Sequence, residues 1–246
     1  MPTPKKVAET NAIFAQLATV HAEAATDLTV VRISLDAKAT IKIGPFSRRG
    51  CSRVSVRAAD HDFPTKDKVT PVGLFLPETD ELFLYGVTSR VTSDCLVDCL
   101  EHWWTEHGRH RPLVRTLLLN LDNGPECHSH RTQFLHRLVA FAARTGLTIK
   151  LAYYPPYHSK YNPVERCWGV LENHWNGSLL DCVSTVLRFA ASMTWKGRSP
   201  VVTPLTTSYA TGVKLPKPAM AALEARIQRL PLLEKWFVTI PGTKVA

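Results

Sequence analysis

The stretch YYPPYHSKYNPVERCWGVLE, residues 153–172, joins the end of an apolar run to the start of a helix. Its paired prolines stop the run and stiffen the loop, because proline fixes φ, lacks an amide hydrogen and restricts the residue before it. Asn162 and Pro163 are typical of a helix N-cap and of the first helical position. Glu165 then lies in the first turn, where the positive end of the helix dipole favours a carboxylate. The stretch therefore predicts a strand, a rigid loop and a helix that presents Glu165.

Apolar periodicity on either side of this stretch predicts further strands and helices. Residues 28–44 alternate apolar and polar side chains, so we expect a strand that enters a hairpin through Ile41 and Ile43. The other expected strands span residues 51–63, 81–89, 114–126 and 147–156. The expected helices span residues 8–25, 92–107, 130–145 and 219–236, and one more starts at Pro163. Residues 197–218 are rich in Pro, Thr and Gly, which predicts an irregular connector.

The order of these elements predicts an α/β fold. Three strands in succession, then helix, strand, helix, strand and helix, indicate three antiparallel strands that feed a mixed sheet. We therefore expect a five-stranded mixed sheet flanked by helices, with a short N-terminal helix and a C-terminal helical extension. A chain of 246 residues is long enough to bury a full core, as one large domain with extensions.

Three carboxylates occupy notable places in this order of elements. Asp36 lies in or beside the first strand, where aspartate is disfavoured, and Asp122 directly follows the fourth strand. The first and fourth strands are adjacent if the sheet is ordered in this way, and the helix that carries Glu165 packs beside them. We therefore expect the three side chains to converge at one edge of the sheet. Carboxylates suit Mg²⁺ or Mn²⁺, and two such ions about 4 Å apart promote phosphodiester displacement.

Each carboxylate also has a simpler interpretation. Asp122 begins an Asp-Asn-Gly turn, which is a common turn sequence without any further role. Asp36 fits an exposed strand end. Glu165 fits a capping box with Asn162, in which the glutamate three residues after the N-cap bonds back to the helix start. Only the combination of the three at matching places in the strand order favours a site.

Other polar clusters give weaker signals. Cys127, His128 and His130 resemble half of a zinc site, but no second Cys/His pair has suitable spacing. The three histidines in EHWWTEHGRH, residues 101–110, are more typical of a solvated helix end than of a metal site. The sequence contains no Gly-rich phosphate loop and no Gly-x-Ser-x-Gly, which excludes the usual NTPase and serine hydrolase signatures.

Composition restricts the setting and the partner. The net charge of +9 favours a polyanionic partner such as nucleic acid. The six cysteines include no Cys-x-x-Cys pair, which is typical of reduced thiols in a cytosolic protein. No apolar run approaches the length of about 18 residues that a membrane span requires, and the first residues lack the apolar segment of a signal peptide.

Longer motifs resemble a known family. The runs at residues 153–177, 117–126 and 32–44 are similar to those of DDE transposases of ISAzo13-type bacterial insertion sequences. MTWKG and YATGVKL, residues 193–197 and 209–215, also fit, so the resemblance extends over roughly residues 10–242. It implies an RNase H-like fold and the catalytic core of a DNA transposase, located with the bacterial nucleoid in the cytoplasm.

The resemblance also implies a mechanism. Asp36, Asp122 and Glu165 become the acidic triad, which holds two Mg²⁺ or Mn²⁺ ions. One ion activates water to nick the element end, and the resulting 3′-OH attacks target DNA. The expected partner is double-stranded DNA, at element ends and target, bound by a homo-oligomer and without a membrane. Two alternatives stay open: a metal-dependent nuclease of the same fold, and an inactive DNA-binding remnant.

The resemblance further suggests domains and DNA contacts. We expect a helical lead-in over residues 1–27, the DDE catalytic domain over 28–180 and an extension over 181–246. Relatives usually carry a longer N-terminal region that reads DNA, so we interpret this chain as a truncated copy or as part of a split reading frame. Four side chains near the acidic triad are expected to meet DNA: Lys38, His158, Lys160 and Arg166. The neighbouring tyrosines either stack on bases or pack against the sheet.

Overall fold

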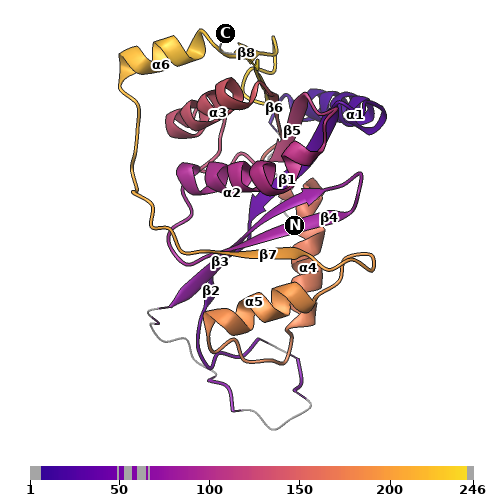
Figure 1. Cartoon of the computed structure of the whole chain (residues 1–246), viewed down its shortest axis with the longest axis vertical. Coiled ribbons are helices and arrows are strands. Elements are labelled where there is room, and N and C mark those ends of the chain that lie inside the picture. Colours follow the sequence, from indigo (N-terminus) through magenta and orange to yellow (C-terminus); the bar gives the residue numbers. More distant parts are fainter. Residues whose placement is uncertain (1–6, 49, 53–56, 60–64, 66, 243–246) are drawn as a thin grey trace.

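The computed structural model describes residues 7–48, 50–52, 57–59, 65 and 67–242 (Figure 1). Its α-helices are α1 (Thr10–Thr26), α2 (Ser93–Glu106), α3 (Thr132–Thr145), α4 (Val164–His174), α5 (Val183–Ser192) and α6 (Lys217–Glu224). Two 3₁₀ turns are η1 (Gly108–His110) and η2 (Ser159–Tyr161). The strands are β1 (Val30–Ala37), β2 (Ile41–Lys42), β3 (Lys68–Leu76), β4 (Glu81–Val87), β5 (Thr116–Leu121), β6 (Thr148–Tyr153), β7 (Val201–Leu205), β8 (Gln228–Arg229) and β9 (Phe237–Ile240).

One mixed sheet organises the molecule. Within the described residues it has nine strands in the order β7-β4-β3-β1-β5-β6-β9-β8, and β2 pairs with β3. The five central strands are antiparallel from β4 through β3 to β1 and parallel from β1 through β5 to β6. This confirms the expected mixed sheet flanked by helices. The sheet is wider than expected because β7 adds to β4 and β9 adds to β6.

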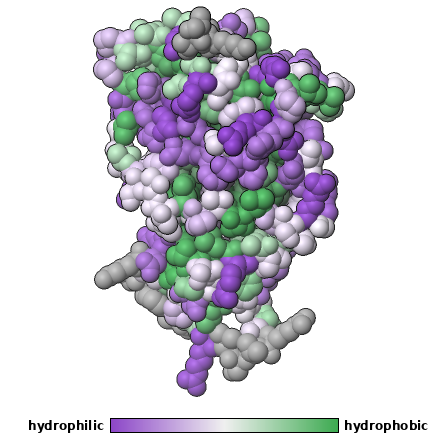
Figure 2. All heavy atoms as spheres, viewed as in Figure 1, coloured by the Kyte–Doolittle hydropathy of each residue, from purple (hydrophilic) through white to green (hydrophobic). Residues whose placement is uncertain are grey.

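Alternation along the strands separates two apolar clusters. Phe83 and Tyr85 of β4 face the larger cluster, together with the buried sides of α2 and α3. Leu82 and Leu84 face the smaller cluster, together with α4 and α5. Figure 2 shows the outer surface of one face, where polar residues dominate around α2 and α3 and hydrophobic residues gather lower down. The helices therefore cover both faces of the sheet and leave its strand ends for a site.

The expected hairpin within residues 28–44 is wrong. β1 and β2 both pair with β3, through Asp36 opposite Gly73 and Ile41 opposite Val69, so they form one interrupted ladder. The physical reason lies between them, because Lys38, Ala39 and Thr40 (residues 38–40) include none of the Gly, Asn or Asp residues that tight hairpin turns favour.

The second expected strand, over residues 51–63, falls mostly outside the described residues. The antiparallel partner of β1 is β3, which sequence patterns missed because Pro71 and Gly73 interrupt an apolar run. Pro71 is tolerated here because it lies just beyond the last register pair with β1, Ala37 opposite Val72.

The C-terminal region also differs from expectation. The helix expected over residues 219–236 ends at Glu224 as α6, and β8 and β9 follow it. Pro231 and a positive φ of 70° at Leu232 turn the chain between these two strands. The expected irregular connector contains β7, and α5 lies in a stretch for which no helix was expected. Among the described helices, none is long and apolar enough to cross a membrane.

Candidate functional site at the carboxyl edge of the central strands

Asp36 and Asp122 lie at the same edge of the sheet because β1 and β5 are adjacent and parallel. Their register pairs Val30 with Thr116 and Ser34 with Asn120, a constant offset along the ladder. The same offset carried forward brings Asp36 opposite Asp122, which directly follows β5. Neighbouring strands lie about 4.8 Å apart. The two carboxylates are thus neighbours across two strands.

Glu165 lies in the first turn of α4, and β1 fixes where that helix starts. The Val164 amide donates a hydrogen bond to Ser34 Oγ at 2.9 Å, so a strand residue caps the helix. Ser34 Oγ donates in turn to Asn162 Oδ1 at 2.5 Å, and Asn162 Nδ2 donates to the Leu35 carbonyl at 3.3 Å. These bonds are buried, and they hold the helix that carries Glu165 against the strand that carries Asp36.

The capping box considered for Asn162 and Glu165 is therefore wrong. The Asn162 backbone is extended, as at an N-cap, but the helix start has no side-chain cap from within its own segment. The Asn162 side chain turns toward β1 instead, because Ser34 and Leu35 provide partners there. The Glu165 carboxylate is consequently free of the capping role.

Trp168 holds the Asp36 side chain. Its Nε1 donates a hydrogen bond to Asp36 Oδ2 at 2.8 Å, from the α4 turn after Glu165. Gly73 lies opposite Asp36 on β3, and a Cβ there would come within 2.6 Å of the indole ring of Trp168. The indole therefore reaches Asp36 only because position 73 has no side chain.

Asp122 sits in the turn that its sequence predicts. Its Oδ1 accepts a hydrogen bond from the Gly124 amide at 3.1 Å, and the buried Cys127 thiol lies 3.8 Å from the same oxygen. The next residue, Asn123, has a left-handed backbone with a φ of 61°. The turn interpretation of Asp122 thus holds, and it fixes the carboxylate at the strand end.

The carboxylates affect one another's titration. Burial raises the pKa of Asp36 to about 7, the Trp168 hydrogen bond opposes this rise, and the charges of Asp122 and Glu165 add to it. Burial also raises the pKa of Glu165, with a further rise from Asp122 and an opposing effect from Lys38. Like charges near one another have this effect because each disfavours ionisation of its neighbour. The three side chains therefore form one electrostatic group.

The donor set fits a hard divalent cation. Carboxylate and amide oxygens are the ligands such ions prefer. Beside Asp122, the Oδ1 atom of Asn123 is buried and has no hydrogen-bond partner in the described structure. As the side chains stand, no three His, Cys, Asp or Glu residues of the described chain are close enough to form a ligand set. The edge thus offers oxygen donors, and a bound cation would relieve the repulsion between its carboxylates. These side chains do not form a closed coordination shell as they stand.

The side chains expected to meet DNA differ in their availability. Lys38 is only 11 % exposed and forms an ion pair with Glu172 at 2.5 Å. His158 stacks on Tyr161, and both rings contact Phe14 of α1. Lys160 lies over the Tyr161 ring, 5.4 Å from its centroid. Arg166 is exposed on α4, one residue after Glu165.

The weaker metal candidates gain no support. Cys127 is buried beneath Asp122, and burial raises the pKa of its thiol well above the ordinary range. His128 and His130 follow Cys127 in the chain and form no ligand group with it within the described residues. All six cysteines are free thiols, as expected from their spacing.

Sequence reasoning missed the residues that support the carboxylates: Ser34, Gly73 and Trp168. Ser34 and Asp36 are two residues apart on β1, so a strand interpretation already put both on one face. Trp168 follows Glu165 by three residues and shares its helix face. No local signal indicated that Gly73 would lie beneath that indole.

Solved structures of Mos1 transposase have the same fold. The paired-end complex with the left transposon end matches with a TM-score of 0.53 and 14% identity, over 77% of this chain and 56% of that chain. The mariner paired-end complex with Mn matches with a TM-score of 0.52 and 10% identity, over 77% and 54%. The strand transfer complex matches with a TM-score of 0.51 and 12% identity, over 77% and 55%.

These matches identify the fold as RNase H-like, and this chain spans little more than half the length of each Mos1 chain. A comparison with curated protein sequences finds no match. The resemblance to DDE transposases is confirmed by a family model that covers nearly the whole chain. With residues 2–241 matched, the chain belongs to the family described as the Rhodopirellula transposase DDE domain.

Proposed function

We propose that this chain is the catalytic core of a DNA transposase that cuts and joins DNA strands at the carboxyl edge of β1 and β5. Asp36, Asp122 and Glu165 form its acidic triad. The observation that carries the proposal is their common edge: two carboxylates end adjacent parallel strands, and α4, which bears the third, is tied to β1 through Ser34. Membership in the DDE transposase family supports the proposed reaction.

The proposed roles follow from the geometry. Asp36 and Asp122 would hold Mg²⁺ or Mn²⁺, and Glu165 would complete the ligand set for two ions. When bound, such ions activate the attacking oxygen and stabilise the leaving one in phosphodiester displacement. The Trp168 hydrogen bond orients Asp36, and the Gly124 amide orients Asp122. A rigid element under each carboxylate keeps its position within the narrow tolerance that such chemistry needs.

The proposed partner is double-stranded DNA, at element ends and at the target, bound by a homo-oligomer. The Mos1 structures include complexes with a transposon end and a strand transfer complex, which supports this partner. In the loop between β6 and α4, Tyr157 is 73 % exposed, and we propose that it stacks on a base. Arg166, His158 and Lys160 are proposed to meet nearby phosphates, whereas the pairing of Lys38 with Glu172 argues for a supporting role there.

The decisive experiment compares two glutamates of α4. Glu165→Gln is expected to abolish Mg²⁺- or Mn²⁺-dependent cleavage of element-end DNA, because it removes a charged ligand. Glu172→Gln is the matched control: its carboxylate bonds Lys38 and Trp175, and seven residues separate it from Glu165, about 10 Å along the helix. We expect the control to retain most activity, measured by gel analysis of a labelled oligonucleotide.

The outcomes separate the alternatives. Loss of cleavage in Glu172→Gln but not in Glu165→Gln would show that the triad is wrongly assigned. Cleavage by the wild type without joining of pre-cut ends to a target would identify a nuclease. DNA binding without any metal-dependent cleavage would identify a binding remnant.

A further inference from the structure

A polar groove of about 720 Å³ lies at the sheet edge that carries Asp36. Its walls combine the three cationic side chains of Lys68, Arg90 and Arg131 with several hydroxyls, among them those of Thr40 and Thr70. Thr40 and Thr70, which both line the groove, share a hydrogen bond of 2.7 Å. Clustered hydroxyls and cations are the groups that proteins use to bind phosphate oxygens.

The strands determine where this groove lies. Lys68 and Thr70 begin β3, three to five residues before Gly73, which faces Asp36 in the register. Arg90 follows the end of β4, which is antiparallel to β3 and ends at the same edge. Three residues of strand span about 10 Å, which is roughly three steps of 3.4 Å along a DNA strand. The groove therefore lies at the same end of the strands as the carboxylates.

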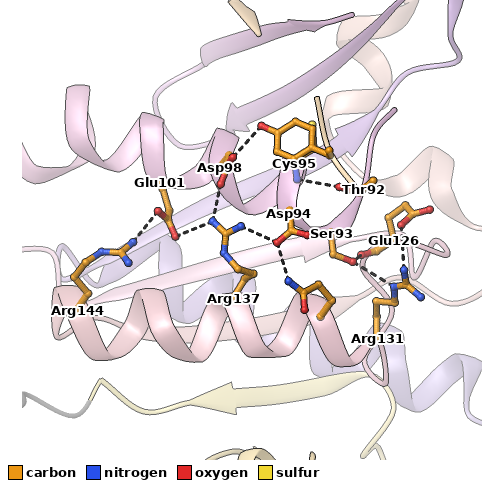
Figure 3. A network of polar contacts seen from close by, with 12 residues as sticks. Thr92, Ser93, Asp94, Cys95, Asp98, Glu101, Glu126, Arg131, Arg137 and Arg144 are labelled. Atoms are coloured by element: carbon orange, nitrogen blue, oxygen red, sulfur yellow. Dashed lines mark hydrogen bonds and ion pairs between the residues drawn. The ribbon is translucent and has the colours of Figure 1, made fainter. Parts of the chain in front are cut away.

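The cations of the groove differ in how they are held. Lys68 and Arg90 are exposed and form no ion pair within the described part of the chain. Arg131 bonds Ser93 Oγ at 3.3 Å and lies 3.8 Å from Glu126, the one carboxylate among the described lining residues. Figure 3 shows these three residues at one end of the polar network between α2 and α3, in which Arg137 joins Asp94 to Asp98. The two free cations thus stand beside a wall that is already fixed.

We propose that this groove binds the phosphate backbone of the DNA that leads into the carboxylate edge, with Lys68 and Arg90 as its main contacts. This rests on the proposed function, because it assigns the path of the same substrate. Each cation that neutralises a phosphate releases a condensed counterion, so binding through the groove depends on salt. Lys68 and Arg90 suit this role because they have no ion-pair partner among the described residues to give up.

The test measures binding of a fluorescein-labelled 20-base-pair duplex by anisotropy, in EDTA, from 50 to 200 mM KCl. Lys68→Ala/Arg90→Ala is expected to weaken binding about tenfold at 50 mM, and to reduce the slope of log affinity against log salt by about 1.8. The control, Arg109→Ala/Lys196→Ala, removes the same charge at the opposite edge, before β5 and beside the β3–β4 turn. We expect this control to keep the wild-type slope.

Equal losses of DNA affinity in the two double variants would contradict the proposal that the groove binds DNA. An unchanged slope of log affinity against log salt in Lys68→Ala/Arg90→Ala would contradict it as well. Circular dichroism melts verify that both variants are folded, which their exposed positions lead us to expect. Because EDTA prevents cleavage, the assay is independent of the triad. If the protein binds DNA through these cations but never cuts it, the proposed function is wrong and the groove proposal stands. If the protein cuts DNA but the double variant binds it as the wild type does, the groove proposal is wrong and the proposed function stands.

Discussion

At the scale of single residues, Asp36 is a carboxylate with a strongly raised pKa. Burial is the largest cause of its raised pKa, and nearby carboxylates add to it. Its pKa of about 7 exceeds the ordinary value of 3.8, so the folded protein holds this proton more tightly than the unfolded chain does. Stability linked to Asp36 is therefore full below about pH 4, declines as the pH rises to 7 and is constant above that.

Asp36→Asn should remove this dependence while keeping an oxygen for the Trp168 hydrogen bond. In metal-free protein, we expect the variant to gain stability over the wild type progressively between pH 4.5 and 7.5. At about 1.4 kcal/mol per pKa unit, the gain has a ceiling of about 4 kcal/mol. Urea unfolding at several pH values measures it.

Asp80→Asn is the control for this prediction. The Lys196 hydrogen bond lowers the pKa of Asp80, which is partly exposed, so its charge does not change over that range. If Asp36→Asn raises the free energy of unfolding by the same amount at pH 4.5 and at pH 7.5, stability is not linked to the proton on Asp36. The same pH trend in Asp80→Asn would also contradict the prediction.

At the scale of elements, the site depends on how α4 docks on β1 and β3. The helix is fixed at its start by Ser34 and one turn later by Trp168, which packs over Gly73. A glycine in a strand often marks such a close approach. Gly169, next to Trp168, is different: it faces solvent, and a Cβ there would meet nothing within 4 Å.

The two glycines therefore predict opposite effects of the same substitution. Gly73→Ala forces a methyl group within 2.6 Å of the Trp168 ring and 2.9 Å of Val164, and we expect a loss of about 1–3 kcal/mol in unfolding free energy. Gly169→Ala should add about 0.5–1 kcal/mol, because alanine loses less backbone entropy within a helix. Denaturant titration of both variants is the measurement, and a neutral Gly73→Ala would refute the packing argument.

At the scale of the whole molecule, the C-terminal region adds a strand to each edge of the central five-stranded sheet. β7 pairs in parallel with β4, and β9 pairs antiparallel with β6. Phe237, Val238 and Ile240 of β9 are buried against the core. The domain boundaries at residues 27 and 180 stay a prediction, although residues beyond 180 complete the sheet in which the triad lies.

Removal of residues 225–246 should consequently abolish stable folding. Three buried apolar side chains contribute about 1.5–3 kcal/mol each, comparable with the total stability of a domain, and the cut exposes an unpaired strand edge. We expect the shortened chain to be insoluble or to lack a cooperative thermal transition. Leu232→Ser, at an 87 % exposed position beside β9, should leave the melting temperature unchanged. A shortened chain with the wild-type transition would contradict this interpretation.

Much of the local structure could be predicted from the sequence by itself. The apolar run before Asp122, the helix that ends at Gly146 and the strand that ends before Pro155 all formed where their patterns indicated. Asp36 and Asp122 could be assigned to one edge because adjacent parallel strands bring their carboxyl ends together. These features depend on neighbours within a few residues, whose preferences the sequence displays directly.

Only the tertiary structure decided which distant segments meet. β3 became the partner of β1 although Pro71 and Gly73 hide its pattern, and β8 formed within the stretch for which the sequence indicated a helix. The Ser34 hydroxyl caps a helix that starts 130 residues later. Such choices depend on which groups find hydrogen-bond partners and packing space once the sheet is assembled, because a buried polar group left without a partner costs more than a local preference supplies. The sequence thus determined the carboxylates and the elements that carry them, and the folded sheet determined what holds them in place.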